Sequence, residues 1–135
     1  MFEAYNTTST TYATNQPVVF STTRHTDCRV RLNNNNTINI SIPGCYYVQF
    51  NAVGAASTAN SQVTVQLYRN GTAVPGVVTS ATTTASTDPE TLTASTIVNV
   101  LPSCAVINNS ASLQFLVTST DGVITSNNVV VFRLK

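Results

Sequence analysis

Apolar and polar residues alternate along much of this chain, most clearly from position 63 to the Pro-Gly pair at 75–76. Val63, Val65 and Leu67 would share one face of an extended strand, with polar residues between them on the other face. Asn70 and Gly71 follow, a pair that accepts the positive φ angles of a type I′ turn. The Pro-Gly pair should then end or bend the returning strand, since proline donates no ladder hydrogen bond. We therefore predict a hairpin with one buried face and one face in water.

The same alternation recurs in segments separated by turn-forming residues, and no segment has the 3.6-residue period of an amphipathic helix. The other strand candidates are 2–6, 16–20, 38–42, 45–53, 92–100, 113–117 and 129–134. About eight to ten short strands at this spacing are typical of an antiparallel β-sandwich. The pattern predicts an all-β protein with a single domain over residues 1–135.

Composition narrows the possible partners. Only 8% of the residues are charged, against about 25% in a typical soluble domain. The polar surface must therefore consist mainly of Thr, Ser and Asn. The formal net charge of +1 gives no basic field for nucleic acid and little repulsion between copies. No apolar run approaches the ~20 residues of a membrane helix, so we expect no membrane insertion.

The first six residues lack the basic and apolar regions of a signal peptide. We expect either a chain that is not exported by that route or a trimmed chain with an added Met. The three cysteines, Cys28, Cys45 and Cys104, cannot all pair within one chain. Buried or half-buried free thiols are the favoured state, and one disulfide plus one free thiol is the alternative. Metal ligation is not expected, because no CxxC spacing occurs.

The sequence contains no set of residues whose spacing indicates a catalytic site. His25 and Asp27 would share one face of a strand, but a triad also needs a positioned nucleophile, so a solvated polar edge is the favoured interpretation. The other acids, Glu3, Asp88, Glu90 and Asp121, are scattered along the chain, and no Asp-x-Asp loop is present for calcium. We expect neither enzymatic activity nor a cofactor.

Arginines are concentrated in the segment 24–31. Arg29 and Arg31 would share a strand face, with Arg24 nearby. These three residues could contact acidic groups of a neighbouring protein shell. Alternatively, they form a solvated strand whose charges protect an exposed sheet edge.

Several short motifs follow one another in a familiar order. They are Phe-Glu-Ala-Tyr at 2–5, Gln-Pro-Val-Val-Phe at 16–20, Pro-Gly-Cys-Tyr-Tyr-Val-Gln-Phe at 43–50 and Leu-Tyr-Arg-Asn-Gly at 67–71. Together they resemble the globular heads of the tumour-necrosis-factor and complement-type jelly-roll superfamily. The run 70–76 is similar to heads of collagen-like spore-surface glycoproteins and of related bacteriophage virion proteins. The segment 129–134 lacks the aromatic-Gly-aromatic pattern that many members carry there.

The resemblance implies a TNF-like jelly roll of about ten strands that forms a homotrimer. The segments 45–53, 92–100 and 129–134 would share the inner sheet, with one face toward the core and the other toward the threefold axis. Alternation then assigns two sets of residues. The expected core set is Tyr46, Val48, Phe50, Val98, Val130, Phe132 and Leu134. The expected trimer interface is Tyr47, Gln49, Asn51, Ile97, Asn99, Val129 and Val131.

The function implied by this resemblance is structural and non-enzymatic. We expect a trimeric module at a bacteriophage virion surface, decorating the capsid or heading a fibre, with capsid or fibre proteins as partners. One alternative is the head of a collagen-like glycoprotein on a bacterial spore or cell surface, although no Gly-X-Y stalk is present. Another is a receptor-binding module that takes a host-surface glycan through Tyr68, Tyr12 or the loop tips.

Overall fold

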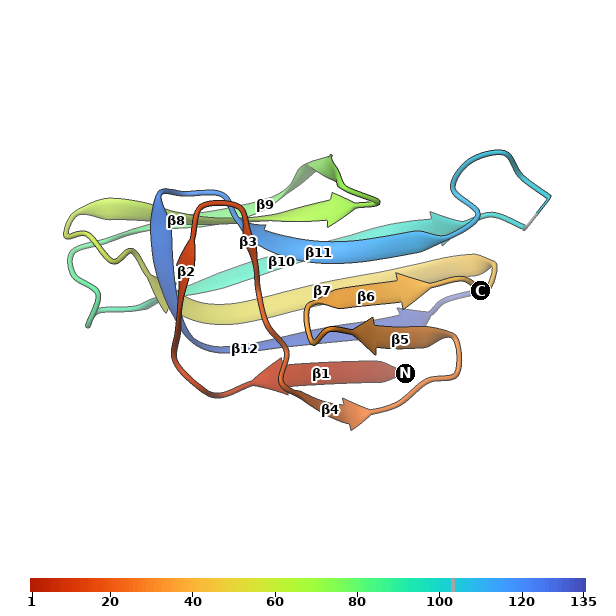
Figure 1. The fold of residues 1–135 in the computed structure, drawn as a ribbon, viewed down its shortest axis with the longest axis horizontal. Helices are drawn as coiled ribbons and strands as arrows, with labels where there is room; N and C mark the ends of the chain where they lie inside the picture. Colours follow the sequence, from red (N-terminus) through yellow and green to blue (C-terminus); the bar gives the residue numbers. More distant parts are fainter. Residues whose placement is uncertain (103) are drawn as a thin grey trace.

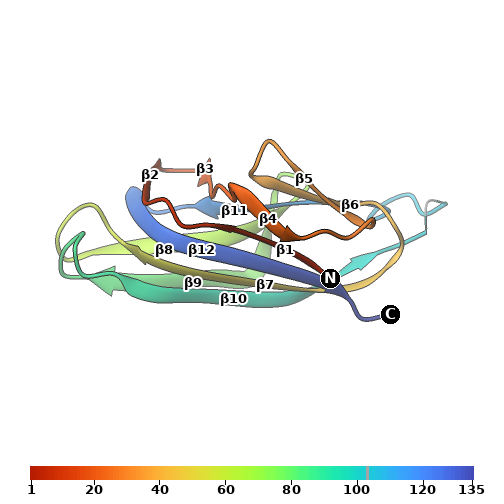
Figure 2. The same ribbon diagram turned by 90° about the horizontal axis from the view of Figure 1, so that it is seen from below.

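Two antiparallel six-stranded sheets lie face to face in the computed structural model, which describes residues 1–102 and 104–135 (Figures 1 and 2). Sheet A has the order β10 (Glu90–Val100), β7 (Gly44–Ala55), β12 (Asp121–Arg133), β1 (Phe2–Asn6) and β4 (Thr22–His25), and β2 (Thr10–Ala13) also pairs with β12. Sheet B has the order β5 (Val30–Asn33), β6 (Thr37–Ile40), β11 (Ala111–Val117), β8 (Ser61–Arg69) and β9 (Thr72–Thr83), and β3 (Gln16–Pro17) also pairs with β11. The predicted all-β jelly-roll sandwich is confirmed.

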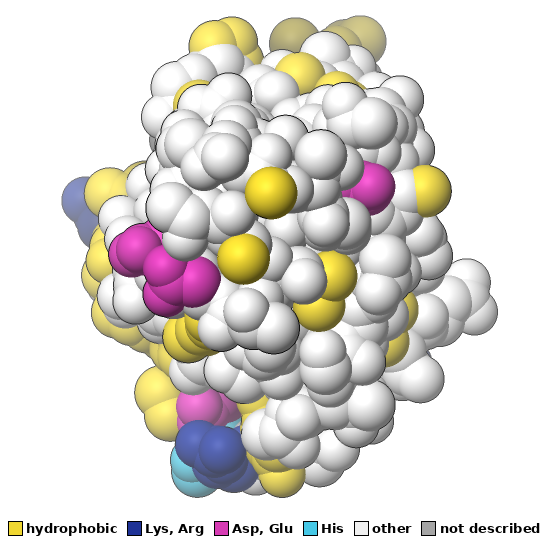
Figure 3. Space-filling model, turned by 90° about the vertical axis from the view of Figure 1, so that its left-hand side faces the viewer, with side chains coloured by type: hydrophobic (Ala, Val, Ile, Leu, Met, Phe, Trp, Pro, Cys, Tyr) yellow, Lys and Arg dark blue, Asp and Glu magenta, His cyan; other side chains and the backbone are white. Residues whose placement is uncertain are grey.

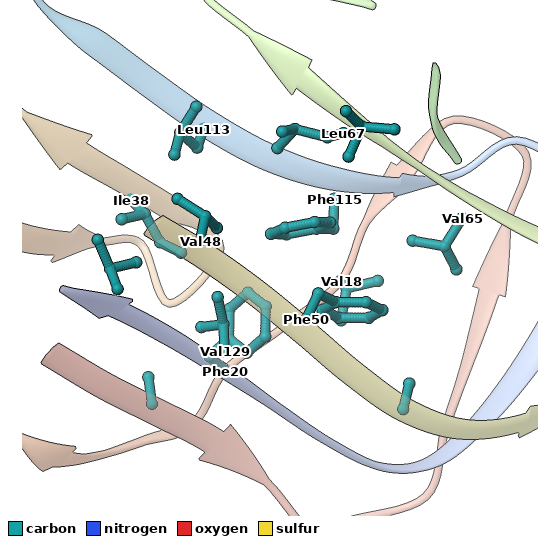
Figure 4. Packing of buried hydrophobic residues seen from close by; sticks show 14 of the residues in the cluster. Val18, Phe20, Ile38, Val48, Phe50, Val65, Leu67, Leu113, Phe115 and Val129 are labelled. Carbon is teal, nitrogen blue, oxygen red and sulfur yellow. The ribbon is translucent and has the colours of Figure 1, made fainter. Parts of the chain in front are cut away.

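Three aromatic rings join the two sheets at the centre of the core (Figure 4). Phe50 of β7 stacks on Phe115 of β11 with ring centroids 4.5 Å apart and an interplanar angle of 15°. Phe20 meets both rings edge-on, at 6.3 and 6.5 Å. Aromatic pairs of these geometries add about 0.5–1.5 kcal/mol each beyond the area that they bury. Of the strand expected over 16–20, only Gln16 and Pro17 are paired, as β3, and Val18 and Phe20 follow it as buried core residues.

The predicted hairpin is present as β8 and β9. Val63, Val65 and Leu67 are fully buried, and the two turn residues Asn70 and Gly71 have φ angles of 52° and 81°. The Pro-Gly pair at 75–76 bends the return strand without ending it. Pairing shifts register between Gln66 and Tyr68, and β9 then continues to Thr83.

The side-chain orientation expected for β12 was wrong. Val129 and Val131 are fully buried, whereas Val130 is only partly buried and Phe132 is 37% exposed. Val129 lies opposite Phe50 and Val131 opposite Val48, and directly opposed residues in an antiparallel pair share a face.

A break in the pairing of β12 with β7 accounts for this reversal. The register shifts between Ile124 and Ser126, so that core-facing positions are even-numbered at Ile124 and odd-numbered from Asn127 onward. Val129 and Val131, expected at the trimer interface, are consequently core residues of the single chain. Leu134, also expected in the core, lies exposed beyond the strand.

The expectation for β7 and β10 agrees with the structure. Tyr46, Val48, Phe50 and Val98 are buried in the core. The intervening residues of both strands point away from sheet B. Cys45 is partly buried and free, as expected, but Cys28 and Cys104 are free and exposed, which corrects the expectation of buried or half-buried thiols.

Candidate interface on the outer face of sheet A

We use the term "sheet A outer face" for the side chains of β7, β10 and β12 that point away from sheet B. They are Tyr47, Gln49 and Asn51 from β7, Thr93, Ser95, Ile97 and Asn99 from β10, and Asn128, Val130 and Phe132 from β12. Five of the seven residues predicted for the trimer interface belong to this face. On β12 it is Val130 and Phe132, rather than the expected Val129 and Val131, that lie on this face.

An apolar row crosses this face near one end of the strands. Tyr47 lies between Phe132 on β12 and Ile97 on β10 in the strand pairing. The rings of Tyr47 and Phe132 are in contact, with centroids 5.1 Å apart and tilted by 41°. Ile97 is 58% exposed. Large apolar side chains thus lie adjacent to one another in water, on strands where neighbouring positions carry Asn, Gln, Ser and Thr.

Further along the strands the same face becomes polar and internally hydrogen-bonded. Asn51 donates to the side chain of Asn128 at 3.2 Å, and Asn128 donates to Glu3 at 3.2 Å. Arg24 of β4 donates to the same Glu3 carboxylate at 3.1 Å and lies 4.5 Å from the centroid of the Tyr5 ring. A hollow of about 300 Å³ opens over this region. Glu3 is nearly buried, so these donors compensate its charge.

Cys45 marks the apolar end of the sheet A outer face. Its thiol donates to the side-chain oxygen of Asn99 at 2.8 Å, and its backbone is paired with Leu134 and Lys135. The thiol lies two residues from Tyr47 along β7. It is therefore a chemical probe of whether this face is covered.

The predicted partner contacts do not form one group. Arg24 is paired with Glu3, and Arg29 makes two hydrogen bonds of 2.9 Å to Asp27. The backbone N–H of Arg29 and the Met1 ammonium also bind Asp27 and hold its pKa below the usual value. Arg31 is exposed on β5, with no ion pair among the described residues.

Candidate catalytic groups are not brought together. His25 lies 3.8 Å from Glu3 rather than next to Asp27, which binds Met1 and Arg29 instead. Asp88 accepts a hydrogen bond from Thr84. Within residues 1–102 and 104–135, no three His, Cys, Asp or Glu side chains lie close enough to hold a metal ion. Tyr12, considered above as an exposed glycan contact, is fully buried and accepts a hydrogen bond from the backbone N–H of Val19 at 3.0 Å.

A group of exposed apolar side chains at one end of the molecule was not predicted, because alternation along the chain does not report the exposure of loop residues. Val106, in the connection from β10 to β11, is 97% exposed, and Ile107 beside it is also exposed. Exposed Leu101 and Ile42 belong to the same end of the molecule, because Val100 pairs with Gly44. This end also holds both chain termini (Figure 1).

No protein-family model matches this chain. No curated protein matches it either. Among solved structures it is similar to the Eiger TNF from S. frugiperda, with a TM-score of 0.71 and 11% identity over 99% of this chain and 93% of that chain. PRD1 vertex protein P5 gives a TM-score of 0.57 and 11% identity over 99% and 96% of the two chains. Murine APRIL gives a TM-score of 0.54 and 8% identity over 95% and 97%.

These similarities extend over nearly the whole chain at low identity, so they define the fold. The protein has a TNF-like jelly-roll fold, which confirms the resemblance seen in the sequence motifs. No helix in the described part of the chain is long and apolar enough to span a membrane.

Proposed function

We propose that this chain is a non-enzymatic structural protein that assembles as a homotrimer through the sheet A outer face. The observation that carries this proposal is the row formed by Phe132, Tyr47 and Ile97. Contiguous apolar side chains on a sheet surface are typical of protein contacts, and aromatic residues are enriched at the centres of such contacts. In a ring of three copies the row would lie around the threefold axis, where the same residues of all three chains cover one another.

The low charge of the chain favours such close association. Only 8% of the residues are charged, so copies that pack side by side bring few like charges together. The charged residues Glu3 and Arg24 at the polar part of the face already neutralise each other. Self-association would therefore bury the apolar row without leaving an unpaired charge at that edge.

We further propose that the trimer is a surface module of a bacteriophage particle, either a capsid decoration or the head of a fibre. Similarity to a vertex protein of PRD1 supports this setting over the other candidates. The head of a spore- or cell-surface glycoprotein is the alternative. Arg31 is the arginine that we retain as a contact to a neighbouring shell protein, because Arg24 and Arg29 are paired within the chain.

Native mass spectrometry tests the assembly. We expect a species of three chains of 14.3 kDa each at micromolar concentration. A species of one chain would contradict the proposed homotrimer. The particle setting is tested separately by mass spectrometry of purified virions from the source culture. Peptides of this chain should copurify with the major capsid protein at a fixed ratio, and their absence from the particles would contradict a virion role.

A further inference from the structure

A polar cleft lies at the end of the sandwich opposite the termini. It has a volume of about 580 Å³ and forms where the start of β8 meets the turn from β11 to β12. Figure 3 is viewed onto this end, where most of the surface is backbone and uncharged polar side chains, with hydrophobic side chains scattered among them. The volume is within the range of about 300–1,000 Å³ that small-molecule sites occupy.

The lining chemistry restricts what this cleft could bind. Every described residue that lines it is Thr, Ser, Gln or Asp. Without a cationic side chain the cleft offers little to a phosphate or carboxylate, and without an apolar one it offers little to a hydrophobic ligand. Asp121 supplies its only carboxylate, and one carboxylate is too few for a protein calcium site. Hydroxyl and amide groups around a carboxylate instead match a neutral polyhydroxy ligand.

Asp121 is the key group in this arrangement. Within residues 1–102 and 104–135, the Asp121 carboxylate makes no ion pair and no hydrogen bond, and only the backbone carbonyl of this residue accepts one, from Ser119. An ionised carboxylate accepts two hydrogen bonds at once, so it can bind two adjacent hydroxyls of a sugar ring. Gln62 and Thr64 on β8, with Thr118 and Thr120 from the turn, add donors and acceptors around it.

The cleft is held in shape by hydrogen bonds between its two walls. The Thr118 N–H donates to the Thr64 carbonyl at 2.9 Å, and the Thr64 N–H donates to the Ser119 hydroxyl at 3.2 Å. The Thr14 hydroxyl lies 2.9 and 2.7 Å from the carbonyls of Ser119 and Thr120, which ties the turn to a third segment. A site that is already ordered loses less conformational entropy on binding.

The close packing of Gly122 fixes the position of its neighbour Asp121. A Cβ atom at Gly122 would lie 2.8 Å from a methyl group of Val63 on β8. Only glycine allows the chain to approach β8 this closely. The carboxylate of Asp121 is thus presented from a backbone position that packing determines.

We propose that this cleft is a binding site for a neutral saccharide, with the Asp121 carboxylate accepting hydrogen bonds from two adjacent sugar hydroxyls. The proposal concerns each chain by itself and rests on the trimer only for avidity. Three clefts on one trimer would raise the apparent affinity for a glycosylated surface by a factor of 10² or more. This site would give the surface module its contact with a host glycan.

Two-dimensional NMR titration tests the site. The probes are the methyl glycosides of glucose, galactose, mannose and N-acetylglucosamine, with sialic acid as an anionic comparison. We expect at least one neutral sugar to bind with a millimolar Kd and to shift the amide signals of residues 62–64 and 118–121. Sialic acid should bind more weakly, because its carboxylate would face Asp121.

Two matched variants separate specific binding from general effects. Asp121→Asn keeps the side-chain shape but removes the charge, and it should weaken binding about tenfold. Asp88→Asn removes a carboxylate from a loop at the same end but outside the cleft, and it should leave the Kd unchanged. The proposal is overturned if no neutral sugar shifts these amides at about 50 mM, or if Asp121→Asn binds as well as the parent. Native mass of the same samples reports assembly independently, so loss of the trimer and loss of sugar binding are distinguishable.

Discussion

The outer faces of the two sheets are built from the same strand alternation but differ in how their side chains are used. On sheet B the polar side chains bind one another: the Ser112 hydroxyl donates to Asn39 at 2.6 Å, and Gln114 donates to Thr37 at 3.0 Å. On sheet A the aromatic pair of Tyr47 and Phe132 lies beside exposed Ile97, near one end of the strands. A sheet face whose polar groups are hydrogen-bonded to one another is stable in contact with water. A row of apolar side chains, in contrast, lowers the free energy of the protein when a partner removes it from water.

The largest expected effect is on the free energy of unfolding, and it differs between the core-facing and the outward-facing side chains of β12. Val131→Asp places a carboxylate in the core and should destabilise the fold by about 4 kcal/mol or more, because the charge has no partner there. Val130→Asp, one residue earlier on the outer face, should leave the chain folded. Circular dichroism during urea unfolding measures both. Equal destabilisation by the two substitutions would contradict the orientation of this strand.

A second prediction compares exposed apolar residues on the two sheets. Ile97 on sheet A and Val78 on sheet B are 58% and 49% exposed. Ile97→Asp should convert the trimer into monomers at micromolar concentration, because it would bury three carboxylates in the apolar contact. Val78→Asp should leave the mass unchanged. Analytical ultracentrifugation distinguishes them, and the comparison fails if both variants remain trimeric or both dissociate.

The difference between the faces could be foreseen only in part. Regular alternation correctly predicted which side chains of β7, β8 and β10 are buried. The run of valines at 129–131 contains no alternation, so its orientation depends on the register break near Ser126, for which the sequence offers no signal. The ion pairs were likewise predictable only where the two partners are close in sequence. Asp27 and Arg29 are neighbours in sequence, but the contact of Arg24 with Glu3 spans 21 positions and required the strand order.

The polar cleft for which we propose saccharide binding could not be predicted from the sequence either. Its two walls, near Gln62 and Asp121, are far apart in the chain and meet only because β8 and β12 begin on the same side of the sandwich. Thr and Ser are so frequent here that no local motif marks the site. The exposure of Val106 and Ile107 could not be predicted either, because two adjacent apolar residues in a sequence do not show whether they are buried or lie at the tip of a loop.

A smaller effect on stability is expected in the turn of the β8–β9 hairpin, and it tests whether this part of sheet B lies outside the contact between copies. Gly71 in the turn between β8 and β9 has a φ angle of 81°, with open space where a Cβ atom would lie. Gly71→Ala should therefore cost only the conformational strain, about 1 kcal/mol. Urea unfolding measures the cost, and the native mass should stay unchanged. Dissociation of this variant would show that the sheet B hairpin contributes to the contact.

The smallest effect concerns Asp27, next to the N-terminal edge of sheet A. The backbone N–H of Arg29 and the Met1 ammonium lower the pKa of Asp27 below its ordinary value of 3.8. A carboxylate with a lowered folded pKa stabilises the fold above pH 3.8, and this stabilisation is lost as the pH falls through the folded value. Thermal unfolding of Asp27→Asn should thus depend less on pH below 3.8 than that of the parent. Identical pH profiles would contradict these contacts.

The central claim, that copies meet on the sheet A outer face, is tested most directly by the alkylation rate of Cys45 as a function of protein concentration. Cys28 and Cys104 are exposed elsewhere on the same chain and serve as internal references. We predict that Cys45 is protected at concentrations where the trimer forms and reacts faster on dilution, while the two reference thiols react at constant rates. A Cys45 that reacts at the same rate in trimer and monomer would contradict the claim.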